Sequence, residues 1–99
     1  MSDEFDRPGG SHLFASQEWR QIADSLRLSP RELQIIQGVF DDSKELAIAR
    51  QLEISPHTVH TYLERIYRKL DVNSRVQVVL RVVVEHMELR SSAQASPAT

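Results

Sequence analysis

The chain has no cysteine among its 99 residues. This excludes disulfide bonds, zinc sites built from thiolates and a cysteine nucleophile, and it fits a reducing compartment such as the cytoplasm. The chain also lacks any apolar run near the ~20 residues that cross a bilayer, and its N-terminus has no apolar segment typical of an export signal. We therefore expect a cytoplasmic protein with no membrane partner.

The chain is also short, which limits what it can do. A domain of this size has a modest core and little room for a large catalytic cleft, so we expect neither enzyme activity nor a cofactor. Hydrophobic residues make up 40% and charged residues 26%, values typical of a chain that folds. His57 and His60 stand three residues apart, but no third ligand is in sight, so no metal site is predicted.

An overall excess of positive charge is missing as well, because the formal net charge is −2. The charge is unevenly distributed, however. Residues 1–49 carry five Lys or Arg and nine Asp or Glu, whereas residues 50–81 carry six and three. A basic second half behind an acidic first half indicates a one-sided surface for a polyanion, although the excess is small.

Breaker residues and apolar periodicity divide the chain into four segments. Residues 1–15 are expected to form a flexible arm, with at most Leu13 and Phe14 touching the body. An extra helix, with Ser16 as its N-cap and Trp19 as its anchor, is predicted over residues 16–27. The main domain covers residues 28–90, and the small polar residues 91–99 are expected to be a disordered tail. The predicted fold is an all-α compact helical bundle.

Two helices in the main domain are predicted from their caps and from the turn between them. Ser29, Pro30 and Glu32 form a capping box that starts a helix, which Asp41 and Asp42 end. A short helix then starts near Ser43 or Lys44 and ends at Leu52. Only three residues separate Leu52 from the next helix start at Pro56, and this spacing is typical of a helix-turn-helix.

The helix over residues 56–70 is the centre of the functional prediction. Ser55 is a favoured N-cap, and Pro56 suits the first helical position. At ~100° per residue, one face is apolar and predicted to pack, with Val59, Leu63, Ile66 and Leu70. The opposite face is polar and indicates a recognition helix, although a surface helix with a solvated face is the alternative reading.

A last helix is predicted over residues 74–88, since a strand there would be overlong and unpaired. Its core-facing residues are expected to be Val76, Val79, Leu80, Val83 and Met87. This register leaves Val78 and Val82 outside as an exposed apolar strip, which we expect to be a dimer contact.

The block from Leu28 to about Val82 resembles the LuxR/GerE-type helix-turn-helix domain of bacterial transcription regulators. The resemblance rests on six motifs in one register: L-S-P-R-E at 28–32, I-A at 48–49, L-x-I-S at 52–55, T-V at 58–59, I-x-x-K-L at 66–70 and V-x-x-R at 72–75. It implies a four-helix unit whose third helix enters the DNA major groove and whose fourth often forms a dimer contact.

The resemblance also implies site residues and partners. The implied base-contacting residues are His57, His60, Thr61 and Glu64. The implied DNA backbone contacts are Lys44, Arg50, Ser55, Thr58, Arg65, Arg68 and Lys69. The implied partners are double-stranded DNA and a second copy of the chain, with RNA polymerase as a further candidate.

The chain departs from the family pattern at several positions. Asp42 and Glu53 stand where the family usually or often has glycine, and Leu46 and His60 stand where it usually has lysine. These changes leave open an interaction module that no longer binds DNA. A resemblance to region 4 of sigma factors is a third reading, but that domain lacks the V-x-x-R seen at residues 72–75.

Overall fold

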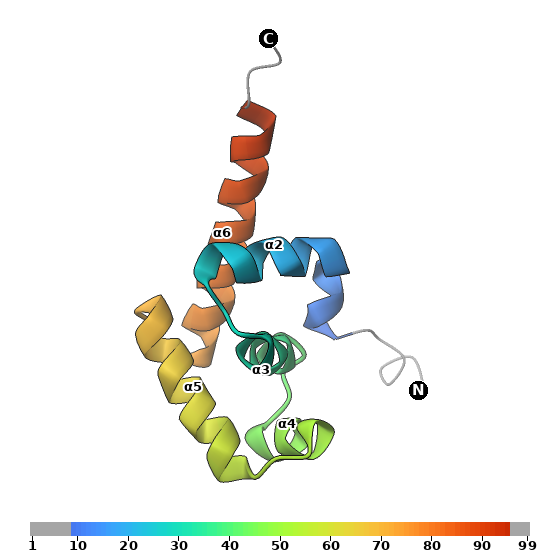
Figure 1. Cartoon of the computed structure of the whole chain (residues 1–99), viewed down its shortest axis with the longest axis vertical. Helices are drawn as coiled ribbons and strands as arrows, with labels where there is room; N and C mark the ends of the chain where they lie inside the picture. Colours follow the sequence, from blue (N-terminus) through green and yellow to red (C-terminus); the bar gives the residue numbers. More distant parts are fainter. Residues whose placement is uncertain (1–8, 96–99) are drawn as a thin grey trace.

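The computed structural model describes residues 9–95 and shows an all-helical chain (Figure 1). No strand occurs in that range, so the predicted all-α fold is confirmed. The elements in chain order are a 3₁₀ helix, η1 (Gly10–Leu13), and five α-helices, α2 (Ser16–Leu26), α3 (Pro30–Phe40), α4 (Glu45–Leu52), α5 (Pro56–Leu70) and α6 (Arg75–Ala95).

Side-chain caps fix the starts of two helices, α3 and α5. The Ser29 hydroxyl accepts a hydrogen bond from the Glu32 amide, and the Glu32 carboxylate accepts one from the Ser29 amide at 2.8 Å, which confirms the predicted capping box at α3. Ser55 caps α5 by accepting from the Thr58 amide at 3.0 Å. α2 differs from the prediction, because Ala15 occupies the N-cap position and Ser16 is already helical.

Helix ends and turns use the left-handed conformation without glycine. Arg27, Asp42, Glu53 and Asp71 all have φ between 58° and 59°. In this region the Cβ atom crowds the following carbonyl, at a cost of about 1–2 kcal/mol per residue. Asp42 and Glu53 are the two positions where the resembled family usually or often has glycine. The chain therefore keeps the left-handed backbone conformation there, at the cost of strain.

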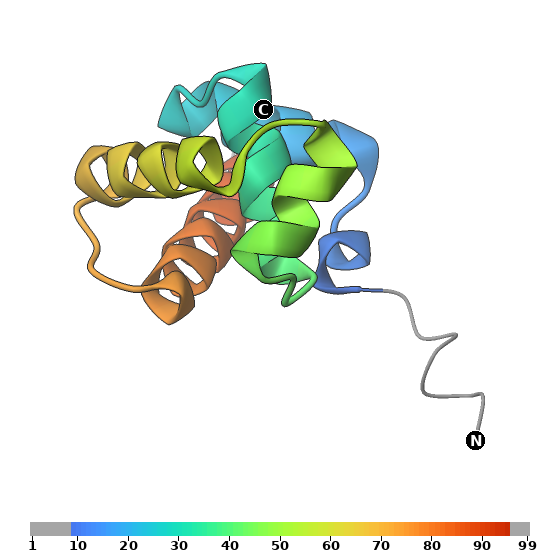
Figure 2. The same ribbon diagram turned by 90° about the horizontal axis from the view of Figure 1, so that it is seen from below.

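α3 lies at the centre of the packing, in contact with η1, α5 and α6. α4 packs against α5, and α2 crosses α6. Figures 1 and 2 show α4 and α5 at the end of the molecule opposite to the projecting end of α6. The core includes residues from each of these five α-helices, among them Ile22, Ile35, Ile36, Ile48, Val59, Leu63 and Ile66.

The described part of the N-terminal arm packs against the body. The Ser11 amide donates to the Asp41 carboxylate at 2.7 Å, and the Trp19 indole N–H donates to the Ser11 carbonyl at 2.8 Å. Phe14 packs edge-on against Trp19, with 5.1 Å between ring centroids, whereas Leu13 is 71% exposed. The structure therefore differs from the expected flexible arm over residues 9–15, while residues 1–8 lie outside the described residues.

The predicted register of α6 was wrong in part: Val79 and Val83 are partly buried and pack against the core as predicted, but the other positions differ. Val78 and Val82 are fully buried, whereas Val76, Leu80 and Met87 are more than half exposed. Apolar residues occupy nearly every position from 76 to 84, so periodicity alone does not select a face.

The buried face of α6 continues through Glu85. A charged residue on this face hid its apolar periodicity in the sequence. The Glu85 carboxylate accepts hydrogen bonds from the Ser25 hydroxyl and from the Arg81 guanidinium, so it is satisfied where it lies. α6 also runs to Ala95 instead of residue 88. The tail expected from residue 91 is thus helical as far as residue 95, and residues 96–99 lie outside the described residues.

Candidate nucleic-acid interface

α4, a three-residue turn and α5 form a helix-turn-helix with the predicted spacing. Glu53, Ile54 and Ser55 make the turn, Glu53 in the left-handed conformation and Ser55 extended. The Ile54 amide donates to the Ala49 carbonyl at 3.0 Å, which closes the end of α4. α5 therefore leaves the turn at an angle set by local hydrogen bonds and by its packing on α4.

α5 has one packed face and one face in solvent. Its apolar side chains, Val59, Leu63, Ile66 and Leu70, are 0–6% exposed, as predicted. The opposite face is exposed and includes all four predicted base-contacting residues, His57, His60, Thr61 and Glu64. The first half of α5 thus offers hydrogen-bond donors and acceptors that are exposed to solvent.

Two of these residues belong to a surface cluster that includes Glu45 from α4. His60 Nδ1 lies 3.2 Å from Glu45 Oε2, and His60 Nε2 lies 3.3 Å from Glu64 Oε2. All three side chains are 40–57% exposed. The Glu45 carboxylate, through its hydrogen bond and its charge, and the Glu64 charge raise the pKa of His60 above its ordinary value. We refer to Glu45, His60 and Glu64 as the acid–histidine cluster.

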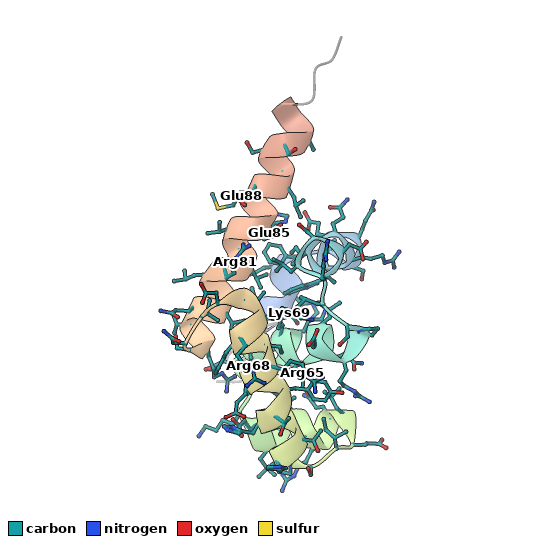
Figure 3. The ribbon with its side chains drawn as sticks, turned by 60° about the vertical axis from the view of Figure 1, so that its left-hand side comes forward. Arg65, Arg68, Lys69, Arg81, Glu85 and Glu88 are labelled. Atoms are coloured by element: carbon teal, nitrogen blue, oxygen red, sulfur yellow. The ribbon has the colours of Figure 1, made fainter. Side chains whose placement is uncertain are left out.

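Six of the seven predicted DNA backbone contacts are found in three different settings. Ser55 and Thr58 form the N-cap of α5, with 2.9 Å between their hydroxyl oxygens. Arg65 and Arg68 are exposed on α5, and the Arg65 guanidinium lies 5.3 Å from the centre of the Tyr62 ring. Lys44 and Arg50 are exposed next to and on α4. Figure 3 shows Arg65 and Arg68 on α5, at the same end of the molecule as α4.

Lys69 has a different environment from the two arginines. Its ammonium group donates to the Glu32 carboxylate at 2.7 Å and to the Arg27 carbonyl at 2.9 Å. Glu32 is 2% exposed; burial opposes its charged form, but hydrogen bonds from Lys69 and Ser29 outweigh this and lower the pKa of Glu32. Lys69 therefore ties α5 to α3, and its ammonium group is already paired with a carboxylate in this structure.

The expected dimer contact needs a correction. Val78 and Val82 are 0% exposed, so neither is available to a second molecule while the domain is folded. The exposed apolar side chains of α6 are Val76, Leu80, Val84 and Met87, which are 46–68% exposed. We call these four residues the outer strip of α6. A groove of about 530 Å³ lies beside it, lined by Leu80 and Val84 and by residues of the α5–α6 turn.

The sequence analysis did not foresee the role of Glu45, the Glu32–Lys69 pair or the outer strip. Glu45 lies 15 residues before His60, and Glu32 lies 37 residues before Lys69, so no local spacing connects either pair. In residues 9–93, no group of three or more His, Cys, Asp or Glu is arranged to hold a metal ion. Over the same part of the chain, no helix is long and apolar enough to cross a membrane.

This fold and this exposed helix define a helix-turn-helix protein. The profile described as "Bacterial regulatory proteins, luxR family" matches residues 26–82, more than half of the chain. The chain therefore belongs to the luxR family of bacterial regulatory proteins.

Relatives from two bacteria show the same similarity. The response regulator GacA of Pseudomonas aeruginosa is 41% identical over 56 residues, which cover 57% of this chain and 26% of that protein. The transcriptional regulatory protein FixJ of Bradyrhizobium diazoefficiens is 36% identical over 52 residues, which cover 52% of this chain and 25% of that protein. This chain thus spans about a quarter of the length of these two relatives. No solved structure gives a significant match.

Proposed function

We propose that the protein is a DNA-binding transcription regulator that inserts α5 into the major groove. The main support is that one face of α5 is exposed while its opposite face packs within the helix-turn-helix. The exposed face includes His57, His60, Thr61 and Glu64. An α-helix fits the major groove, where histidine donates to guanine acceptors and glutamate accepts from the cytosine amino group. Regulation of bacterial transcription takes place in the cytoplasm, which we propose as the location of the protein.

The phosphate contacts in this proposal come from both sides of the exposed face. Arg65 and Arg68 lie on α5, and Lys44 and Arg50 lie next to and on α4. The hydroxyl groups of Ser55 and Thr58 stand at the N-terminal end of α5, where the helix dipole favours an anion. Lys69 is left out of this set because Glu32 holds its ammonium group.

The slope of affinity against salt concentration tests the proposal. Each phosphate neutralised contributes about 0.9 to the slope of log K against log salt concentration. Arg68→Ala should therefore flatten the slope by about 0.9 with a random-sequence fluorescent duplex. Arg90→Ala is the matched control, because Arg90 is an exposed arginine in the last two turns of α6, and Figure 1 shows that the projecting end of α6 lies away from α4 and α5. Equal slopes for the wild type and for both variants would favour an interaction module that does not use this surface for DNA.

We further propose that the protein binds as a homodimer through the outer strip of α6. Four exposed apolar side chains at intervals of four, four and three residues form a continuous face on a helix. Contiguous exposed apolar surface of this kind marks interaction sites, and a two-fold dimer presents the same patch from both copies. Two copies would then place their α5 helices on half-sites about one helical turn apart.

Leu80→Asp tests the dimer contact, since Leu80 lies in the middle of the outer strip and is 57% exposed. The variant should sediment as a monomer and lose cooperative binding to a duplex with two half-sites. Leu13→Asp is the matched control, because Leu13 is an exposed leucine of η1, outside the strip. If Leu80→Asp and Leu13→Asp sediment and bind alike, the outer strip is not the dimer contact.

A further inference from the structure

The acid–histidine cluster places two negative charges on the face that would meet DNA. Glu45 is the first residue of α4, and His60 and Glu64 lie one turn apart on α5. In the free protein each ring nitrogen of His60 faces one carboxylate, at 3.2 Å and 3.3 Å. His60 is therefore fixed across the two helices of the helix-turn-helix by contacts from both.

The charge of the cluster depends on His60. The cluster carries a net charge of −1 when the imidazole is protonated and −2 when it is neutral. The charged groups that act on His60 are Glu45 from α4 and Glu64 from α5, and His57 lies one turn before it on the same face. Lys44 precedes Glu45 in the chain. Because the pKa of His60 is raised, the change in charge occurs above the ordinary histidine range near 6.5.

The two ring nitrogens of His60 contact carboxylates from different elements. Glu64 lies on the exposed face of α5, so a base that donates to Glu64 would release Nε2, whereas Glu45 at the start of α4 would keep its contact with Nδ1. With a proton retained on Nδ1, Nε2 is a donor when the ring is charged and an acceptor when it is neutral.

We propose that Glu45 is a positioning residue for DNA recognition, which holds Nδ1 of His60 so that Nε2 faces a base edge. A protonated Nε2 then donates a hydrogen bond to guanine, and an unprotonated Nε2 accepts one from the amino group of adenine or cytosine. This inference rests on the proposed function. Guanine presents acceptors in the major groove, whereas adenine and cytosine present amino donors. The protein would thus have a base preference at one position of its site that depends on pH.

The first experiment measures binding to a pool of 20-base-pair duplexes of random sequence at pH 6.0 and pH 8.5, at constant ionic strength. Wild-type protein should enrich guanine at one position about five-fold at pH 6.0, which is near the lower end of what a good base contact provides. This enrichment should be lost at pH 8.5. Glu45→Gln should move the midpoint of the change toward pH 6.5, and His60→Gln should abolish it.

Glu53→Gln is the matched control for Glu45→Gln. Glu53 is exposed in the turn between α4 and α5, so its substitution removes one negative charge from the same region without touching His60. Both variants should bind all duplexes more tightly, because a repulsive charge is gone. The midpoint of the pH profile should move for Glu45→Gln alone. If the profiles of the two variants coincide, Glu45 acts through general repulsion and the inference is overturned.

A second measurement separates this inference from the proposed function. The imidazole resonances of His60, followed by NMR during a pH titration of the free protein, should give a lower midpoint in Glu45→Gln than in wild type. An unchanged midpoint overturns the inference while DNA binding stands. If the wild type binds no duplex at either pH, the proposed function fails, and the inference fails with it.

Discussion

The buried Glu32–Lys69 pair carries the sharpest prediction about stability. Glu32 is 2% exposed and accepts from Lys69 at 2.7 Å and from the Ser29 amide at 2.8 Å. Replacing Lys69 with methionine retains most of the side-chain volume but removes the positive charge. The carboxylate is then left buried with the Ser29 contacts as its remaining stabilisation.

The expected cost follows from the burial of each partner. Removal of one partner from a fully buried pair costs about 3–5 kcal/mol. The Lys69 side chain is 34% exposed, so water reaches one side of the pair, and Glu32 retains the Ser29 amide. We therefore expect Lys69→Met to lower the free energy of unfolding by about 2 kcal/mol, less than for a dry pair. In a domain of this size that is a fall of roughly 8–16 °C in Tm.

The pH dependence provides a second signature. The pKa of Glu32 is lowered in the folded state, so its ion pair contributes stability above the unfolded value of about 4.3. That contribution is lost as the pH falls through the folded pKa. Without Lys69, burial still opposes the charged carboxylate while the hydrogen bond and charge that lowered its pKa are gone, so the variant loses stability at neutral pH. The difference between wild type and Lys69→Met should therefore be larger at pH 7 than at pH 3.5.

Urea unfolding followed by circular dichroism at both pH values measures this difference. Arg68→Met is the control, because it removes an exposed charge from the adjacent position, and such surface changes usually stay within about 0.5 kcal/mol. A cycle with Glu32→Gln and the double variant isolates the pair. If Lys69→Met costs no more than Arg68→Met at pH 7, the ion pair does not hold α5 against α3 and the reasoning is refuted.

Two further predictions concern backbone geometry and close packing. Glu53→Gly should raise the free energy of unfolding by up to about 1 kcal/mol, because relief of the backbone strain at φ 58° exceeds the cost of the added entropy of the unfolded chain. Chemical denaturation at neutral pH measures this change. A loss of stability would show that Glu53 makes a favourable contact that outweighs its strain. Gly38→Ala should destabilise by about 1–3 kcal/mol, although alanine is the better helix former, because the new Cβ would lie 2.8 Å from Ile48 Cγ1 in the core. A rise in Tm for Gly38→Ala would mean that the contact between α3 and α4 adapts freely.

The parts of the fold that local chemistry determines were predictable from the sequence. Ser55 and Pro56 mark the start of α5, and one clear apolar stripe identifies its packed face, so the predicted bounds of 56–70 agree with the structure. Ser29 and Glu32 likewise locate the start of α3. Each of these signals lies within a single helix and its cap.

The features that the sequence did not predict depend on contacts between distant segments. The face of α6 that is buried is set by its packing on α2, α3 and α5, and Glu85 is tolerated in the buried line only because Ser25 and Arg81 satisfy it. Similarly, the sequence predicts Lys69 as a phosphate contact, and it does not show that α3 brings the Glu32 carboxylate beside the Lys69 ammonium group. Charge and exposure at such positions follow from the tertiary fold and not from spacing along one helix.

The close approach of Gly9 and Gly10 to the end of α3 has a mechanical consequence. A Cβ atom on Gly10 would lie 2.1 Å from the Phe40 carbonyl oxygen, so the two chain segments are in direct backbone contact there. The Ser11–Asp41 hydrogen bond joins the same segments, and α4 begins four residues after Asp41. A displacement of the chain at Gly9 would therefore act directly on Phe40 and Asp41, at the end of α3. The N-terminal segment is thus tied to the end of α3, four residues before the first helix of the helix-turn-helix.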